Sequence, residues 1–291
     1  MMKLKKLLLT AQISLVSLLS ANAQTNPVKN FEQLIISTPP KELGLDTFYK
    51  SYVDAFGIPI VSSENVSSTA LLIARDIVNY MLVKRPDVRE VMIKKNARLS
   101  IIGQKEMQTD LPECRDWKKP VFTDQRLTDK ERADYYKPGG IAGMTDRGYW
   151  DQRARGMGGI QTSCAEENLL GVPGTRYFGE HILIHEWSHN IMYCLQFADP
   201  DLYKQIKVAY QKAREKGLYK GQYAINTVEE YWAEGTQWWF WSNYEFYDGK
   251  VRVQSPDDLR NYDPELYNLL SKVYIGHHAP CDIYYGRNLK N

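Results

Sequence analysis

The sequence lacks four features, each of which would define a class of protein. Its 291 residues carry a formal net charge of only +2, without the basic excess that neutralises nucleic-acid phosphates. Its four cysteines include no C-x-x-C pair, which argues against a zinc ribbon. Beyond the N-terminal region no apolar run reaches the ~18 residues of a membrane span, and no repeat or low-complexity tract occurs. We therefore expect a globular protein with no nucleic-acid partner and no integral membrane segment.

The first 23 residues have the three parts of a secretory signal peptide. Met1–Lys6 is basic, Leu7–Leu19 is mostly apolar, and Ala21-Asn22-Ala23 supplies the small residues of a cleavage site. The apolar stretch is too short and too polar to remain in a bilayer. The next residue is Gln24, not the cysteine of a lipoprotein. The sequence predicts an exported protein, periplasmic or secreted.

Because export favours disulfides, we expect two of them among the four cysteines. Three pairings are possible, and sequence spacing does not choose between them. Cys194 falls near the end of a predicted helix and Cys281 in the C-terminal tail, so a bond between them would hold the tail to the core. Cys114 and Cys164 would then be joined, anchoring a long loop beside a predicted strand.

Residues 24–291 are predicted to form one α/β (α+β) domain with three parts. In residues 24–103, apolar residues at helical spacing precede a strand, which is typical of a small mixed sheet backed by helices. Residues 104–177 are rich in charge, proline and glycine, and predict a long ordered loop leading to an edge strand near Gly159–Ser163. Residues 178–291 carry the strongest helical patterns, at about 178–196, 228–241 and 264–274, and a C-terminal tail.

The first of these strong helices contains His185-Glu186-Trp187-Ser188-His189. Four residues turn a helix by about 400°, so His185 and His189 share a face one turn apart. Two imidazoles placed in this way can bind one tetrahedral ion. Glu186 lies beside them, where it can hydrogen-bond a water on that ion rather than bind the ion itself. The pattern indicates a catalytic metal site; the alternative is a core helix with two hydrogen-bonded histidines.

A third metal ligand is expected from the next strong helix. Glu230 and Glu234 lie one turn apart on one face of a largely apolar helix, where an inward carboxylate needs a partner. If Asn226 is the N-cap, Glu229 completes a capping box and leaves Glu230 free for the ion. If Thr227 is the N-cap, Glu230 itself is used in the box.

The pair of motifs His185-Glu186-x-x-His189 and Glu230-x-x-x-Glu234 resembles the gluzincin metallopeptidases. The stretch from Tyr223 to Glu234 is similar to the catalytic domain of anthrax lethal factor and its bacterial and fungal relatives, with looser similarity over much of residues 50–245. The resemblance implies a zincin-like fold and a tyrosine at position 223 that faces the substrate carbonyl. The toxin's substrate-recognition domains are lacking in this sequence, so its target does not carry over.

The sequence therefore predicts an exported zinc peptidase with one Zn²⁺ per chain and a peptide or protein substrate. His185, His189 and Glu230 would hold the ion, Glu186 would be the general base, and Tyr223 would donate a hydrogen bond to the oxyanion. Two alternatives stay open. One is a zinc hydrolase of a non-protein amide such as a cell-wall peptide, and the other is a catalytically silent binding module on the same scaffold.

Two further groups of residues are assigned to this site. Glu234 is expected to accept a hydrogen bond from one of the histidines, most plausibly His185, because ligand histidines usually donate their second ring proton to a carboxylate or carbonyl. In the predicted edge strand, Gly159, Ile160 and Gln161 would pair with an extended peptide.

The roles of three residues near the motif stay open. For His181, one turn before His185, a hydrogen-bonded structural role is favoured over a fourth ligand, because a hydrolase leaves that position for water. For Glu166 and Glu167, capping or a solvated turn is favoured over binding of a cation or a substrate amine.

Overall fold

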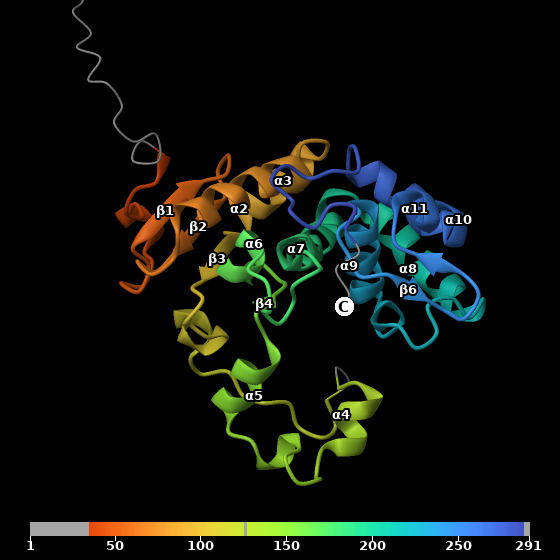
Figure 1. The fold of residues 1–291 in the computed structure, drawn as a ribbon. Coiled ribbons are helices and arrows are strands. Elements are labelled where there is room, and N and C mark those ends of the chain that lie inside the picture. The colour runs from red at the N-terminus through yellow and green to blue at the C-terminus, as the bar shows by residue number, and fades with distance from the viewer. Residues whose placement is uncertain (1–34, 125–126, 288–291) are drawn as a thin grey trace, which may run out of the picture. The chain divides into compact units, whose positions relative to one another are not determined.

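The protein is described here by a computed structural model that covers residues 35–124 and 127–287. The chain divides into Met1–Phe31, which includes the predicted signal peptide and lies outside the described residues, and one compact unit, Glu32–Asn291 (Figure 1). Within the described ranges, no helix combines the length and the apolar character that a membrane span requires.

A five-stranded mixed sheet forms the N-terminal part of this unit. Its spatial order is β1-β2-β3-β5-β4. β2, β3 and β5 run parallel, while β1 and β4 are antiparallel to their neighbours at the two edges. The predicted small mixed sheet is confirmed. The strands are β1 (Ser51–Asp54), β2 (Pro59–Ser62), β3 (Arg98–Ile102), β4 (Gly156–Met157) and β5 (Gln161–Ala165).

Two helices connect β2 to β3 and cover the sheet. α2 (Ser68–Met81) begins where the Ser67 side chain accepts a hydrogen bond from the Thr69 N–H, and α3 (Pro86–Lys94) begins with proline. Both lie in the region 24–103 where helices backing the sheet were predicted, and apolar periodicity and capping residues agree there. α6 (Glu166–Leu170) follows β5 directly.

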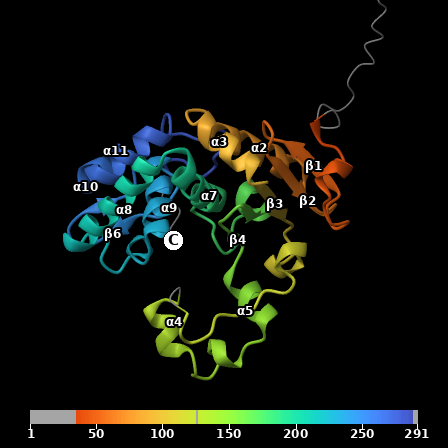
Figure 2. The same ribbon diagram turned by 180° about the vertical axis from the view of Figure 1, so that it is seen from behind.

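α7 (Ile182–Ala198) lies between the sheet and the C-terminal helices, as both views show (Figures 1 and 2). It contacts β5 and α3 on one side, and α8 and α9 on the other. The C-terminal elements are α8 (Pro200–Glu215), η5 (Tyr223–Ile225), α9 (Val228–Trp239), β6 (Phe246–Tyr247), β7 (Arg252–Val253), α10 (Pro256–Tyr262) and α11 (Pro264–Val273).

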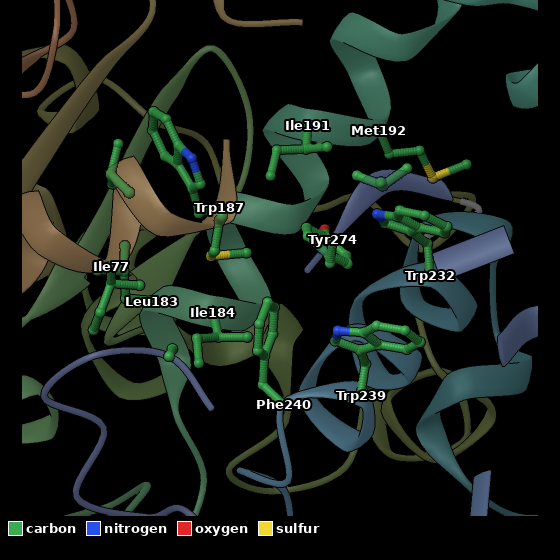
Figure 3. Close-up of a cluster of buried hydrophobic side chains, with 14 of the residues drawn as sticks. Ile77, Leu183, Ile184, Trp187, Ile191, Met192, Trp232, Trp239, Phe240 and Tyr274 are labelled. Atoms are coloured by element: carbon green, nitrogen blue, oxygen red, sulfur yellow. The ribbon is translucent and has the colours of Figure 1, made fainter. Parts of the chain in front are cut away.

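The main core surrounds α7 on most of its circumference. Trp187 packs toward the sheet side and Met192 toward α9, so the helix presents apolar side chains in several directions (Figure 3). Such a helix is held in one rotation about its axis, because any other rotation would expose apolar surface. The labelled side chains of this cluster are Ile77, Leu183, Ile184, Trp187, Ile191, Met192, Trp232, Trp239, Phe240 and Tyr274.

Residues 104–155, predicted as a long loop, contain short helices with a small core of their own. Trp150 of α5 packs edge-on against Trp117, with 4.9 Å between ring centroids. The helices are η2 (Gln108–Asp110), η3 (Pro112–Cys114), α4 (Asp129–Asp134), η4 (Ile141–Gly143) and α5 (Asp146–Arg153), and η1 (Lys41–Leu43) precedes the sheet. The buried members of this small core are Leu127, Tyr135, Ile141, Tyr149 and Trp150.

All four cysteines are free, so the predicted disulfides Cys114–Cys164 and Cys194–Cys281 are wrong. Cys164 on β5 belongs to the main core, whereas Cys114 packs with Ile102 in a second cluster. Successive residues of a strand point to opposite faces, so the sheet separates the first pair. In the second pair, Cys194 is buried in α7 while Cys281 is exposed.

Candidate active site

Two imidazoles of α7 and one carboxylate of α9 converge beside a cleft. The rings of His185 and His189 lie 4.9 Å apart between centroids, as their spacing on one helix face predicts. The Nε2 atom of His185 lies 3.0 Å from Oε2 of Glu230, and Nε2 of His189 lies 3.6 Å from the same oxygen. The sequence predicted that these three side chains lie close together, and in the structure they do.

The start of α9 brings Glu230 to the histidines. Of the two candidate caps, Thr227 is the N-cap, and its side chain accepts a hydrogen bond from the Glu230 N–H. The Glu230 carboxylate does not turn back to the cap. It faces α7, and its Oε1 accepts a hydrogen bond of 3.2 Å from the hydroxyl of Tyr223 on η5. The Glu230 N–H thus takes part in capping α9, while the Glu230 carboxylate stays available to the histidines.

The geometry of the three side chains fits a zinc ion. Their candidate ligand atoms all lie within 4.8 Å of one another. A tetrahedral zinc with bonds of ~2.0–2.1 Å requires its ligand atoms to be about 3.3 Å apart, and the two measured distances to Glu230 lie on either side of that value. Three protein ligands leave the fourth position for water or substrate, as in catalytic zinc sites.

The charges of the cluster are coupled. Burial acts to lower the pKa of His185, but the hydrogen bond to Glu230 and nearby carboxylates raise it well above 6.5. Burial acts to raise the pKa of Glu230, yet its hydrogen bond with His185 lowers it to about 2. Burial lowers the pKa of His189 to about 4, so this imidazole is neutral and its lone pair is free at neutral pH. The contact between Nε2 of His185 and Oε2 of Glu230 lies where the ligand set would hold a cation.

Two further groups with acid–base chemistry face the same cleft. Burial raises the pKa of Glu186 to about 7, although the charge of His185 and a hydrogen bond from the Gly158 N–H act in the opposite direction. Its Oε2 lies 4.0 Å from Nε2 of His189. Burial and the charge of Glu230 raise the pKa of Tyr223, so its hydroxyl keeps its proton at neutral pH and can donate it in a hydrogen bond.

The expected hydrogen bond from His185 to Glu234 is not formed. The Nδ1 atom of His185 is 3.7 Å from Oε1 of Glu234 but only 2.9 Å from Oε1 of Gln237. Glu234 instead accepts hydrogen bonds from the side-chain amides of Gln222, at 3.0 Å, and Asn243, at 2.9 Å. Gln237, missed in the sequence, lies two turns beyond Glu230 on the same face of α9, and that spacing was the available signal.

The cleft has a volume of about 1380 Å³. Its lining includes His185, Glu186 and His189, and also Gly159 and Ile160 of the predicted edge strand. The lining does not include Gln161, the third residue of that prediction, whose exposed side chain accepts a hydrogen bond from Arg98. β5 is an internal strand, paired with β3 and β4, so the edge of the sheet at the cleft is β4.

Glycines in and after β4 let the backbone lie directly against α7. A Cβ atom at Gly158 would lie 2.6 Å from the Cβ and Cδ2 atoms of His189, and one at Gly156 would lie 3.1 Å from Cγ of Glu186. The distance at Gly158 is shorter than real Cβ contacts, and the distance at Gly156 is tighter than nine in ten of them. The absence of side chains therefore allows the Gly158 N–H to reach the Glu186 carboxylate.

Three residues whose roles the sequence left open are buried and lie outside the candidate ligand set: His181, Glu166 and Glu167. His181 is the N-cap residue of α7, is fully buried, and has no hydrogen-bond partner for either ring nitrogen among the described residues, so the expected hydrogen-bonded histidine is wrong. Glu166 accepts hydrogen bonds from the Ser67 and Gln104 N–H groups. Glu167 forms a two-pronged salt bridge with Arg155. Both carboxylates are buried, which corrects the solvated turn.

No protein-family model matches the chain, and no curated protein matches it. Among solved structures, the Pro-Pro endopeptidase from Paenibacillus alvei is similar at 16% identity, over 74% of this chain and 97% of that chain, with a TM-score of 0.45. This distant likeness says nothing about the substrate. The resemblance to the lethal factor catalytic domain stays a prediction from the two helix motifs.

Proposed function

We propose that this protein is a zinc-dependent peptidase with one ion held by His185, His189 and Glu230. One observation carries the proposal: the ligand atoms of these side chains lie within 4.8 Å of one another at the wall of a cleft. A site that only stabilised the fold would use four protein ligands and would be closed to solvent. Here three ligands leave a position open to the cleft.

The residues around the three ligands have the chemistry of amide hydrolysis. A bound zinc ion would lower the pKa of water and polarise the scissile carbonyl. Glu186, with a pKa of about 7, takes the proton of the attacking water and delivers it to the leaving amine. Tyr223 donates a hydrogen bond to the oxygen on which negative charge develops.

An extended peptide is the substrate favoured by the shape of the site. The edge strand β4 and the glycines after it border the cleft with main-chain groups that can pair with a peptide backbone. A cell-wall peptide would also offer amide bonds to this site. Cleavage assays with both kinds of substrate distinguish it from a protein substrate. A silent binding module has no use for Glu186. The signal-peptide pattern of residues 1–23 supports export to the periplasm or beyond.

The substitution Glu186→Gln tests the mechanism. Its amide preserves the shape of the side chain, and the carboxylate is not a ligand, so zinc content should stay at one ion per chain. Turnover of a peptide library should fall by about 10²-fold or more, the usual effect of losing a positioned acid–base group.

The same change at the exposed Glu215 of α8 is the matched control and should leave turnover unchanged. Equal cleavage by the Glu186→Gln variant and the unmodified protein would refute the role of Glu186. If the unmodified zinc-loaded protein cleaves no peptide in a broad library, the binding module becomes the better description.

A further inference from the structure

We infer that Gln237 is the positioning residue that fixes His185 for metal binding, an inference that rests on the proposed zinc site. Its Oε1 atom lies 2.9 Å from Nδ1 of His185, on the opposite side of the ring from the Nε2 atom that faces Glu230. The Gln237 side chain is fully buried, so water does not compete for this contact. It is the direct link between α9 and the ring of His185 on the side away from the ion.

The surroundings of Gln237 determine which way its amide points. Its Nε2 atom donates a hydrogen bond of 3.3 Å to the main-chain oxygen of His181 and lies 3.5 Å from Oε2 of Glu180. A main-chain oxygen can only accept, so the amide nitrogen must be on that side. The amide oxygen must then face His185, because turning the group over would bring two oxygens together.

The fixed amide in turn determines the tautomer of His185. An amide oxygen accepts but cannot donate, so Nδ1 of His185 carries the proton in the contact. In the neutral imidazole the lone pair is then on Nε2, the atom that points at Glu230 and the candidate ion position. Two hydrogen bonds thus connect the His181 main-chain oxygen, the Gln237 amide and the His185 ring. The donor and the acceptor in each of them are fixed.

Glu234 does not replace Gln237 in this role. Its Oε1 is 3.7 Å from Nδ1 of His185, beyond hydrogen-bond distance, and its Oε2 is engaged by Gln222 and Asn243. The site thus orients its histidine with a side-chain amide carbonyl, whereas a carboxylate is the charged alternative in zinc sites. The amide fixes the ring without adding a charge of its own at the contact.

The substitution Gln237→Met tests the inference, because methionine has a similar length but no strong acceptor. Zinc affinity, measured by competition with a chromogenic chelator, should fall by about 10–100-fold. The absorption spectrum of the cobalt-substituted protein should change, since it reports the ligand geometry. Thr236→Val is the matched control: Thr236 is also buried in α9, but its hydroxyl contacts the Trp232 main-chain oxygen and the Tyr274 hydroxyl, not a histidine. This control should leave zinc affinity and the cobalt spectrum unchanged.

A second measurement needs no variant, in case Gln237→Met does not fold. Nitrogen NMR of the zinc-loaded protein should show His185 protonated at Nδ1 and bound to the ion through Nε2. Ligation through Nδ1, or zinc affinity unchanged by Gln237→Met, would overturn the inference and leave the proposed function intact. An unmodified protein that binds no zinc would overturn both.

Discussion

His181 should cost the protein stability in acid, and His181→Leu should remove that cost. The ring is fully buried at the start of α7, and both of its nitrogens are unpaired among the described residues. Its centroid lies 5.8 Å from that of the Tyr284 ring, which is perpendicular to it. Burial lowers the pKa of His181 from 6.5 to about 3. In the unfolded chain the same imidazole takes up a proton near its ordinary pKa.

The sign and size of the effect follow from proton linkage. Between pH 6.5 and about 3 the unfolded state binds one proton more than the folded state, so the free energy of unfolding falls as the pH is lowered. Each pH unit is worth about 1.4 kcal/mol, so the full loss from His181 is on the order of 5 kcal/mol. Above pH 6.5 this group contributes no pH dependence.

Urea unfolding at pH steps between about 4 and 7.5 measures this loss. A metal chelator present throughout removes the separate pH dependence of metal binding. The free energy of unfolding of the unmodified protein, minus that of His181→Leu, should decrease steadily as the pH falls. His278→Leu, the same change at an exposed histidine, controls for the loss of a histidine. If the difference between unmodified protein and His181→Leu is constant over this range, His181 is not held neutral by burial.

Two further predictions concern the site. Gly158→Ala should weaken zinc binding and lower turnover, because the new Cβ would lie 2.6 Å from His189. The control Gly143→Ala, where a Cβ meets nothing within 4 Å, should change neither. Competition with a chelator measures the zinc affinity of both variants. Tyr223→Phe should lower kcat by about 10²-fold, the loss expected for one oxyanion donor, with zinc content unchanged. Equal kcat in steady-state assays of this variant would show that the hydroxyl only hydrogen-bonds Glu230.

Local signals predicted the elements that are stabilised locally. α11 was expected at about 264–274, and it runs Pro264–Val273, with the Asp263 side chain accepting a hydrogen bond from the Leu266 N–H. Here proline at the first position, the capping carboxylate and the apolar spacing agree. α4 and α5 were missed because they are short and depend on packing with residues distant in sequence, such as Trp117 against Trp150.

The disulfide prediction failed because it came from the expected cellular compartment and not from the geometry of the cysteines. The predicted export led us to expect two disulfides, but alternation along β5 places Cys164 in the main core, across the sheet from Cys114. Residue spacing does not reveal which face of a strand a residue occupies until the register with β3 is known, here Cys164 opposite Ile101. The pairing could therefore not be predicted from the sequence.

The partner of His185 was missed for a related reason. Glu234 and Gln237 both lie on the face of α9 that carries Glu230, one and two turns beyond it, and sequence spacing permits either to approach α7. The preference for Glu234 came from the usual chemistry of ligand histidines. What decides between them is the packing of α7 against α9, which brings Gln237 to 2.9 Å and leaves Glu234 at 3.7 Å from the same nitrogen. A helix face can thus be predicted from one chain, but the residue on it that makes the contact depends on how two helices cross.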